Sequence, residues 1–192
     1  EDNGNRRFIA VQMDAECDEN TEAFKDGYKT ISKISKERIR RAGKKIKEEN
    51  PLTTQNLDIG FRAFKVDSSN MKDVYYTPEE VKQDQLELST NNIKEDRSPE
   101  DLLFQVFLDW GLELILPVVK ETIEGKTVFF VDGNVMAACF DTGIKEKLFK
   151  VLAKRKPLRV VFRDDSYGSD SLKINVEQIF KLISPATEIK SI

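Results

Sequence analysis

The fold is decided by residues 126–140, which read KTVFFVDGNVMAACF. Residues 126–131 and 134–140 are short runs of apolar, β-branched and aromatic side chains, which is the pattern of strands. Between them, Asp132 and Gly133 give a two-residue hairpin signal, because both positions tolerate a positive φ. A further strand-like run at residues 114–123 precedes this pair and is separated from it by Glu124 and Gly125. The sequence therefore predicts a three-stranded meander.

Helical and extended patterns alternate on both sides of this meander. Residues 144–154 and 175–183 are predicted helices, whereas residues 158–163 and 188–192 are predicted strands. Upstream, Ser98, Pro99 and Asp101 have the spacing of a helix start with a capping box, and Gly111 suits the end of that helix. Residues 98–192 are thus expected to form a C-terminal α/β domain. Its core is expected to contain Leu103, Phe107, Trp110, Val128, Phe130, Val160, Phe162 and Ile179.

The first half of the chain has a different organisation. Residues 6–13 (RRFIAVQM) and 58–66 (DIGFRAFKV) have the short apolar pattern of strands. Residues 28–47 carry isoleucines near helical spacing, and Pro51 follows that helix. Residues 67–97 are polar and weakly patterned, so we expect a linker that holds one short helix near residues 79–88.

Composition excludes several classes of protein. Among 192 residues, 31 are Lys or Arg and 34 are Asp or Glu, so the net charge of -3 argues against a basic nucleic-acid wrapper. The chain has no His, which removes His-based triads, bases and metal ligands. Cys17 and Cys139 are far apart and fit a reducing cytoplasm. No apolar run approaches the ~20 residues that span a bilayer, so we expect no membrane contact. Because the chain starts at Glu1 rather than Met, we interpret it as a C-terminal piece of a longer protein.

The strongest charge cluster lies at residues 36–47 (KERIRRAGKKIK), where seven basic residues accompany a single acid, Glu37. One interpretation is contact with DNA phosphates from a helix near the backbone, for which Arg38, Arg41 and Lys45 are the candidates. The alternative is a solvated helix face that is balanced by the acidic stretch before it. No aromatic side chain lies among these charges, as a platform for stacking single strands would need.

An acidic loop directly follows the strand predicted at residues 6–13. It contains Asp14, Glu16, Asp18, Glu19 and Glu22. In open α/β sheets an acid at the carboxyl end of a strand often holds ribose hydroxyls. The alternative is a solvated loop or the acidic start of a helix.

Two further groups of residues could carry chemistry. Asp164 and Asp165 follow a predicted strand, with Asp170 nearby, and could hold magnesium, although adjacent acids point apart as often as together. Cys139 lies in an apolar run and is expected to be buried and inert. Cys17 lies among carboxylates, which disfavour its thiolate. We therefore predict no metal site and no catalytic residue.

Long blocks of the sequence resemble a known family. These blocks are GNRRFIAVQMDAE (4–16), KERIRRAGKKIKEE (36–49), LDIGFRAFKVDSSN (57–70), IKEDRSPEDLLFQVFLDWGLEL (93–114) and KPLRVVFRDDSYGSDSLKINVEQIF (156–180). In this order they resemble the modification subunit of type III restriction-modification systems. The resemblance covers nearly the whole chain and identifies it as a C-terminal fragment of such a subunit.

The resemblance implies an activity for the parent subunit. Members of this family are adenine-specific DNA methyltransferases that use S-adenosylmethionine. Their Asp-Pro-Pro-Tyr motif, glycine-rich cofactor loop and target-recognition domain lie upstream of the first block, and no Gly-x-Gly occurs in this chain. The fragment is therefore expected to be inactive and to bind no cofactor by itself. Either Gln12 or Asp14 is expected to contact the cofactor ribose in the full-length subunit.

The resemblance also implies a domain organisation. Residues 1–66 would be the C-terminal part of the methyltransferase domain, a remnant edge of a Rossmann-like sheet. Residues 67–97 would be a linker, and residues 98–192 a C-terminal α/β domain with a β-meander. The expected partners are DNA, a second modification subunit in a homodimer, and the restriction helicase-nuclease subunit. The alternative is that residues 98–192 act purely as a protein-interaction module that docks either subunit, which predicts an exposed apolar patch.

Overall fold

The computed structural model describes residues 7–13, 15–72 and 92–192. The chain divides into two compact units, Glu1–Phe64 and Lys65–Ile192. Within the described ranges, no helix combines the length and the apolarity that crossing a membrane requires.

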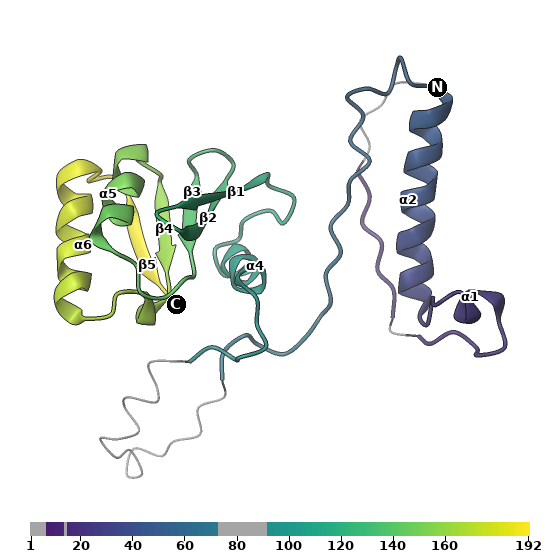
Figure 1. Ribbon diagram of the computed structural model, residues 1–192, viewed down its shortest axis with the longest axis horizontal. Helices are drawn as coiled ribbons and strands as arrows, with labels where there is room; N and C mark the ends of the chain where they lie inside the picture. Colours follow the sequence, from purple (N-terminus) through teal and green to yellow (C-terminus); the bar gives the residue numbers. More distant parts are fainter. Residues whose placement is uncertain (1–6, 14, 73–91) are drawn as a thin grey trace, which may run out of the picture. The chain divides into compact units, whose positions relative to one another are not determined.

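The C-terminal unit is built on a five-stranded mixed sheet whose strands follow the chain order, β1-β2-β3-β4-β5 (Figure 1). The strands are β1 (Val118–Ile123), β2 (Lys126–Val131), β3 (Met136–Cys139), β4 (Arg159–Phe162) and β5 (Glu188–Ser191). The first three strands pair antiparallel, so the meander is confirmed. β3, β4 and β5 pair parallel, as helical crossovers between neighbouring strands allow.

Helices cover both faces of this sheet. They are α4 (Pro99–Asp109), α5 (Glu146–Arg155) and α6 (Asp170–Ile183), with a 3-10 turn, η1 (Asp164–Ser166), after β4. Figure 1 shows α5 and α6 together on one side of the strands and α4 on the other. Alternate side chains of β2 contribute to the cores on the two faces of the sheet. Val128 and Phe130 pack towards α5 and α6, whereas Phe129 and Val131 pack towards α4. The α/β class is therefore confirmed.

Local signals placed several boundaries correctly. Ser98 Oγ accepts a hydrogen bond from the Asp101 N–H (3.2 Å), and the Asp101 carboxylate accepts one from the Ser98 N–H (2.8 Å), which is the predicted capping box. Asp132 and Gly133 both have a positive φ, at 45° and 68°. The prediction of a two-residue hairpin turn is nevertheless wrong, because Val131 pairs with Met136 and the loop has four residues. Of the eight predicted core residues, only Trp110 and Ile179 are partly rather than fully buried.

Two boundaries differ from the prediction by four or five residues. β1 begins at Val118, four residues later than predicted, because residues 113–116 form a turn in which the Leu116 N–H donates to the Glu113 carbonyl (3.1 Å). α6 begins at Asp170, five residues earlier than predicted. Ser169 is its N-cap and accepts a hydrogen bond from the Leu172 N–H (3.3 Å), so the cap and not the first apolar repeat sets the start.

The N-terminal unit contains two helices, α1 (Glu22–Lys25) and α2 (Ile31–Glu49). The prediction of a helix at residues 28–47 is therefore confirmed. The predictions of strands at 6–13 and 58–66 are wrong for their described residues, which are extended but have no strand partner in the described part of the chain. Ile9 and Val11 are 94% and 92% exposed rather than buried. The apolar pattern was correct for a strand, but a strand also needs a hydrogen-bonded neighbour.

The two ends of the predicted linker pack on the C-terminal unit. The Lys72 N–H donates to the Asn92 carbonyl (2.7 Å), and the Lys94 N–H donates to the Asn70 carbonyl (2.9 Å). Between these bonds, Ile93 is buried in the core under α4. Arg97 lies 3.3 Å from the Asp67 carboxylate. The short helix predicted near residues 79–88 lies outside the described residues.

Candidate nucleic-acid interface

The basic cluster lies on α2, the longest described helix. Thr30 caps its start by accepting a hydrogen bond from the Lys33 N–H (3.4 Å), and the helix ends at Asn50, before Pro51. The helix carries eight basic residues and three acidic ones. Its Lys44–Glu48 and Lys45–Glu49 pairs have the lysine first, which is the less favourable order on a helix. These two ion pairs within α2 therefore stabilise its lysines only weakly.

Arg38, Arg41 and Lys45 share one face of α2, because they stand at positions i, i+3 and i+7. We call these three residues the basic stripe. It extends about 10 Å along the helix axis, at ~1.5 Å per residue. Arg41 and Lys45 have side chains that are 72% and 74% exposed. The structure therefore brings the three predicted DNA-contacting residues together.

The members of the stripe differ in their existing partners. Arg41 Nε donates to Glu37 Oε1 (2.8 Å), and this hydrogen bond is the main reason that the pKa of Arg41 lies above its ordinary value. Arg41 Nη2 also donates to the Tyr28 hydroxyl (3.3 Å). Lys45 Nζ lies 3.6 Å from Glu49. Arg38 forms no ion pair with any residue in the described part of the chain. Exposed pairs of this kind are weak, so a phosphate can compete with these carboxylates.

Another part of the N-terminal unit packs on a different side of α2. Ile59 lies against Gly43, where a Cβ would come within 3.0 Å of the Ile59 Cβ. The Arg40 guanidinium lies 5.6 Å from the centre of the Phe61 ring. Gly43 is displaced by roughly 160° around the helix from the basic stripe, given 3.6 residues per turn. Residues 59–61 therefore leave the stripe open.

The described carboxylates of the acidic loop, which begin at Glu16, do not pair with the stripe. Asp18 accepts hydrogen bonds from the backbone N–H and side-chain amide of Asn20 (2.9 and 3.0 Å), and Glu22 opens α1. Within residues 15–72, no carboxylate of this loop forms an ion pair with a cation of α2. The acidic loop thus leaves the charge of the helix available to another partner.

Of the two residues predicted to contact the cofactor ribose, the structure describes Gln12. Gln12 is exposed, and its side-chain Nε2 donates to the neighbouring Met13 carbonyl (3.1 Å). Asp14 lies outside the described residues. An exposed amide with one local partner keeps its Oε1 free to accept from a hydroxyl, but it offers only one side of a binding site.

The carboxylates after β4 each have a cationic neighbour. Asp165 lies 2.6 Å from Arg163, and Asp164 lies 2.8 Å from Lys173. Among the described residues, no group of three or more carboxylates and thiols is arranged to hold a metal ion. In open α/β sheets, ligands bind where the strand order reverses and adjacent crossover helices lie on opposite faces. The parallel strands β3, β4 and β5 have no such point, because α5 and α6 both lie on the same face.

Cys139 is fully buried in β3, and burial raises the pKa of its thiol from 9.0 to about 11. A thiol with so high a pKa is a poor nucleophile at neutral pH. The prediction of a buried cysteine at this position is therefore confirmed.

The sequence analysis missed a charged cluster on the α4 face of β4 and β5. Trp110 contacts two cations, because Arg159 and Lys190 lie 5.0 and 4.9 Å from its ring centre. Glu188 lies 3.2 Å from Arg159 and 3.3 Å from Lys190. The signal in the sequence was the alternation Glu188, Ile189, Lys190 in a predicted strand, which sets two opposite charges on one face.

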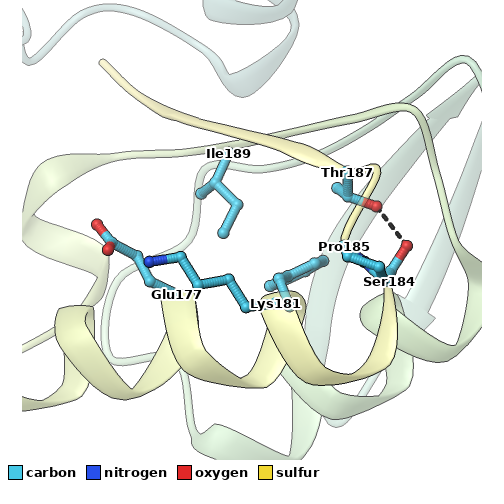
Figure 2. A pocket seen from close by; sticks show the side chains of 7 residues that line it. Glu177, Lys181, Ser184, Pro185, Thr187 and Ile189 are labelled. Atoms are coloured by element: carbon cyan, nitrogen blue, oxygen red, sulfur yellow. Dashed lines mark hydrogen bonds between the residues drawn. The ribbon is translucent and has the colours of Figure 1, made fainter.

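Two shallow cavities flank α6 in the C-terminal unit. One, of about 260 Å³, lies between α6 and β5 and is lined by Glu177, Phe180, Lys181, Ser184, Pro185, Thr187 and Ile189 (Figure 2). The other, of about 380 Å³, lies between α5 and α6 and includes Ile179 and Leu182. Neither cavity contains a residue that the sequence analysis selected for cofactor or DNA contact.

Comparison with known proteins gives one informative similarity. No protein-family model matches the chain. Over 65 residues it is 46% identical to the type III restriction-modification enzyme StyLTI Mod subunit of Salmonella typhimurium. This stretch covers 34% of the present chain and 10% of that subunit. The chain thus resembles part of the modification subunit of a type III restriction-modification enzyme, as its sequence blocks had indicated.

Proposed function

We propose that the chain is the C-terminal part of the modification subunit of a type III restriction-modification system. The observation that carries this proposal is the 46% identity over 65 residues to the StyLTI Mod subunit. The parent subunit would transfer a methyl group from S-adenosylmethionine to adenine in a specific DNA site, in the bacterial cytoplasm. Its partners would be DNA, a second modification subunit and the restriction subunit.

In this proposal, residues 1–66 complete the methyltransferase domain of the parent subunit. The exposed apolar side chains of residues 8–13 support it, since Phe8, Ile9, Val11 and Met13 are between 66% and 94% exposed. A run of exposed apolar side chains on extended backbone is typical of a surface that another layer covers. Residues 7–13 would become a strand in a Rossmann-like sheet, with Gln12 or Asp14 at its end beside the cofactor ribose. Residues 67–97 would form the linker, and residues 98–192 the C-terminal domain.

The basic stripe would contact the DNA backbone rather than the bases. Long cationic side chains on an exposed helix face fit phosphates, which position a protein on DNA without carrying sequence information. The open stripe, with Arg38 unpaired among the described residues, supports this role. The recognition sequence would then be set elsewhere in the parent subunit.

The isolated chain should not bind the cofactor. It supplies one or two hydrogen bonds of ~1 kcal/mol net each, whereas immobilising a ligand costs about 4 kcal/mol or more. The chain also contains neither an Asp-Pro-Pro-Tyr motif nor a Gly-x-Gly loop. We infer that it contributes to methylation only as part of the full-length subunit.

The second candidate function is a protein-interaction module in the C-terminal unit. Two exposed apolar residues on α6, Ile174 at 60% and Leu182 at 85%, favour this role. They would form part of a surface for the restriction subunit. The sheet beneath α6 would then act as a rigid scaffold rather than as a catalytic domain.

A methyl-transfer assay tests the first proposal. Tritium from labelled S-adenosylmethionine should appear in adenine when the full-length subunit is incubated with duplex DNA, and not when the isolated chain is used. In the full-length subunit, Gln12→Ala and Asp14→Ala should weaken cofactor binding unequally, and the larger loss identifies the ribose contact. A full-length subunit that methylates no DNA would refute the proposal.

A further inference from the structure

β5 is an edge strand with unused hydrogen-bonding groups. It pairs with β4 on one side, and no strand of the described residues pairs with its other side. The Glu188 N–H donates to the Leu158 carbonyl (2.9 Å), and the Ile192 N–H donates to the Phe162 carbonyl (3.0 Å). The even-numbered residues therefore bond to β4. Because the direction alternates along a strand, Ile189 and Ser191 direct their backbone groups to the open edge.

The side chains of β5 divide between the two faces of the sheet. Ile189 pairs with Val160 and packs on the core beneath α5 and α6. In Figure 2 it points towards α6 and lines the shallow cavity together with Glu177 and Lys181. Glu188 and Lys190 lie on the opposite face, where Lys190 contacts Trp110. An added strand would therefore meet an apolar side chain on one face and a Glu–Lys pair on the other.

This arrangement is complementary to itself. In a two-fold antiparallel pairing centred on Ile189, the two copies of Ile189 exchange both of their backbone hydrogen bonds. In the same register Glu188 stands directly opposite Lys190 of the second copy, and Lys190 opposite Glu188. Opposite charges at such cross-strand positions are stabilising. The two Ile189 side chains meet on the other face, above the cavity beside α6.

The other edge of the sheet does not have this property. On β1, Lys120 and Glu121 are neighbours in sequence and point to opposite faces. No two-fold antiparallel pairing can therefore set one opposite the other. Pairings centred on Lys120 or Glu121 instead place two like charges against each other, which is destabilising.

We propose that β5 is a homodimer interface, at which a second copy of this chain pairs antiparallel around Ile189 and the two sheets become continuous. A closed two-fold contact of this kind uses the same surface on both copies and covers the exposed β5 edge of both sheets. The inference deepens the proposed function. The β5 pairing itself stands apart from that function, and only the identification of this dimer with a pair of modification subunits rests on it.

Charge exchange at the edge tests the pairing in the full 192-residue chain. Sedimentation velocity across a concentration series should show a wild-type dimer. Glu188→Lys sets Lys opposite Lys twice, and Lys190→Glu sets Glu opposite Glu twice, so each variant should be weakened at least 10-fold in dimerisation. The double variant Glu188→Lys/Lys190→Glu restores both pairs and should dimerise again. An equimolar mixture of the two single variants should form a heterodimer. A wild-type chain that stays monomeric, or a dimer that Glu188→Lys leaves unchanged, would overturn the proposal.

A cross-link tests the register independently. In a Cys17→Ser background, Ile189→Cys should form an intermolecular disulfide on mild oxidation, because the Cα atoms of a hydrogen-bonded antiparallel pair lie ~5.5 Å apart, within disulfide range. Ser191→Cys is the matched control. Its copies should lie on the order of 13 Å apart, with four residues of strand between them, and should not cross-link. Equal cross-linking of both variants would refute this register.

These tests are separable from those of the proposed function. Methyl transfer is measured on the full-length subunit, and dimerisation is measured on this chain without DNA or cofactor. Loss of the β5 pairing would leave the methyltransferase assignment standing. Conversely, failure of methyl transfer would leave the edge pairing as a property of the chain itself.

Discussion

Removing the charge of the basic stripe should change the salt dependence of DNA binding by a calculable amount. The variant is Arg38→Gln/Arg41→Gln/Lys45→Gln, which keeps polar, helix-compatible side chains on an exposed face. The fold should be retained because these side chains make only surface contacts, the shortest being the 2.8 Å hydrogen bond to Glu37. Circular dichroism of the variant provides the check.

The magnitude follows from counterion release. Each phosphate that the protein neutralises contributes a slope of about −0.9 to the plot of log affinity against log salt concentration. Three contacts therefore give about −2.7, which corresponds to a loss of affinity of roughly 40-fold between 50 and 200 mM salt. The triple variant should lose this part of the slope. Arg38→Gln alone should lose about 0.9, because no ion pair in the described part of the chain competes for Arg38.

Fluorescence anisotropy with a labelled duplex measures the slope, and a matched variant controls for net charge. Lys33→Gln/Lys36→Gln/Lys47→Gln also removes three charges, but from the other side of α2, towards Gly43 and Ile59. This control should keep a slope close to that of the wild type. Equal slopes for the stripe variant and the control would show that α2 acts as a diffuse charge, and the stripe would be refuted as an interface.

The remaining predictions concern the fold. Phe149→Ala removes a fully buried ring that lies 4.9 Å from Phe162 and is stacked 5.8 Å from Tyr167, so urea unfolding should show a loss of about 3–5 kcal/mol; a loss below about 1 kcal/mol would contradict the core described here. Arg97→Ala removes the cation beside Asp67, so the Lys72 and Lys94 amides should exchange faster while the Val128 amide stays protected. Burial raises the pKa of Cys139 from 9.0 to about 11, so the buried neutral thiol stabilises the fold fully below pH 9 and this contribution is lost as the pH rises towards 11. Cys139→Ala should remove that part of the decline, and iodoacetamide at pH 8 should leave Cys139 unmodified in the folded protein.

Much of the C-terminal unit was predictable because its signals are local. The capping box at Ser98 and the positive φ of Asp132 and Gly133 each depend on a few adjacent residues, and both were predicted correctly. The apolar pattern of residues 126–140 predicted two paired strands, but not their register. A two-residue turn would have paired Val131 with Asn134, whereas Val131 pairs with Met136 across a four-residue loop. The start of α6 was misplaced because a single serine cap outweighed the apolar periodicity.

The N-terminal unit was harder to predict because a strand needs a hydrogen-bonded neighbour, which an apolar pattern by itself does not specify. Residues 7–13 have the composition of a buried strand, yet Ile9 is almost fully exposed. The composition of a segment indicates which conformations suit its residues, whereas the burial of its side chains depends on whether another element packs against them. The basic stripe, in contrast, was predictable from helical spacing alone, since i, i+3 and i+7 always share a face. The Trp110 cluster required the tertiary structure, because its members come from the C-cap of α4, from β4 and from β5.

Isothermal titration calorimetry with S-adenosylmethionine tests the central claim most directly. If the chain is the C-terminal part of a methyltransferase subunit, the full-length subunit should bind the cofactor and the isolated 192-residue chain should give no measurable heat of binding. A truncated subunit that lacks these residues should lose the binding, and adding the isolated chain to it should restore the binding. Micromolar binding by the isolated chain would contradict the account, because it would place a complete cofactor site within these residues.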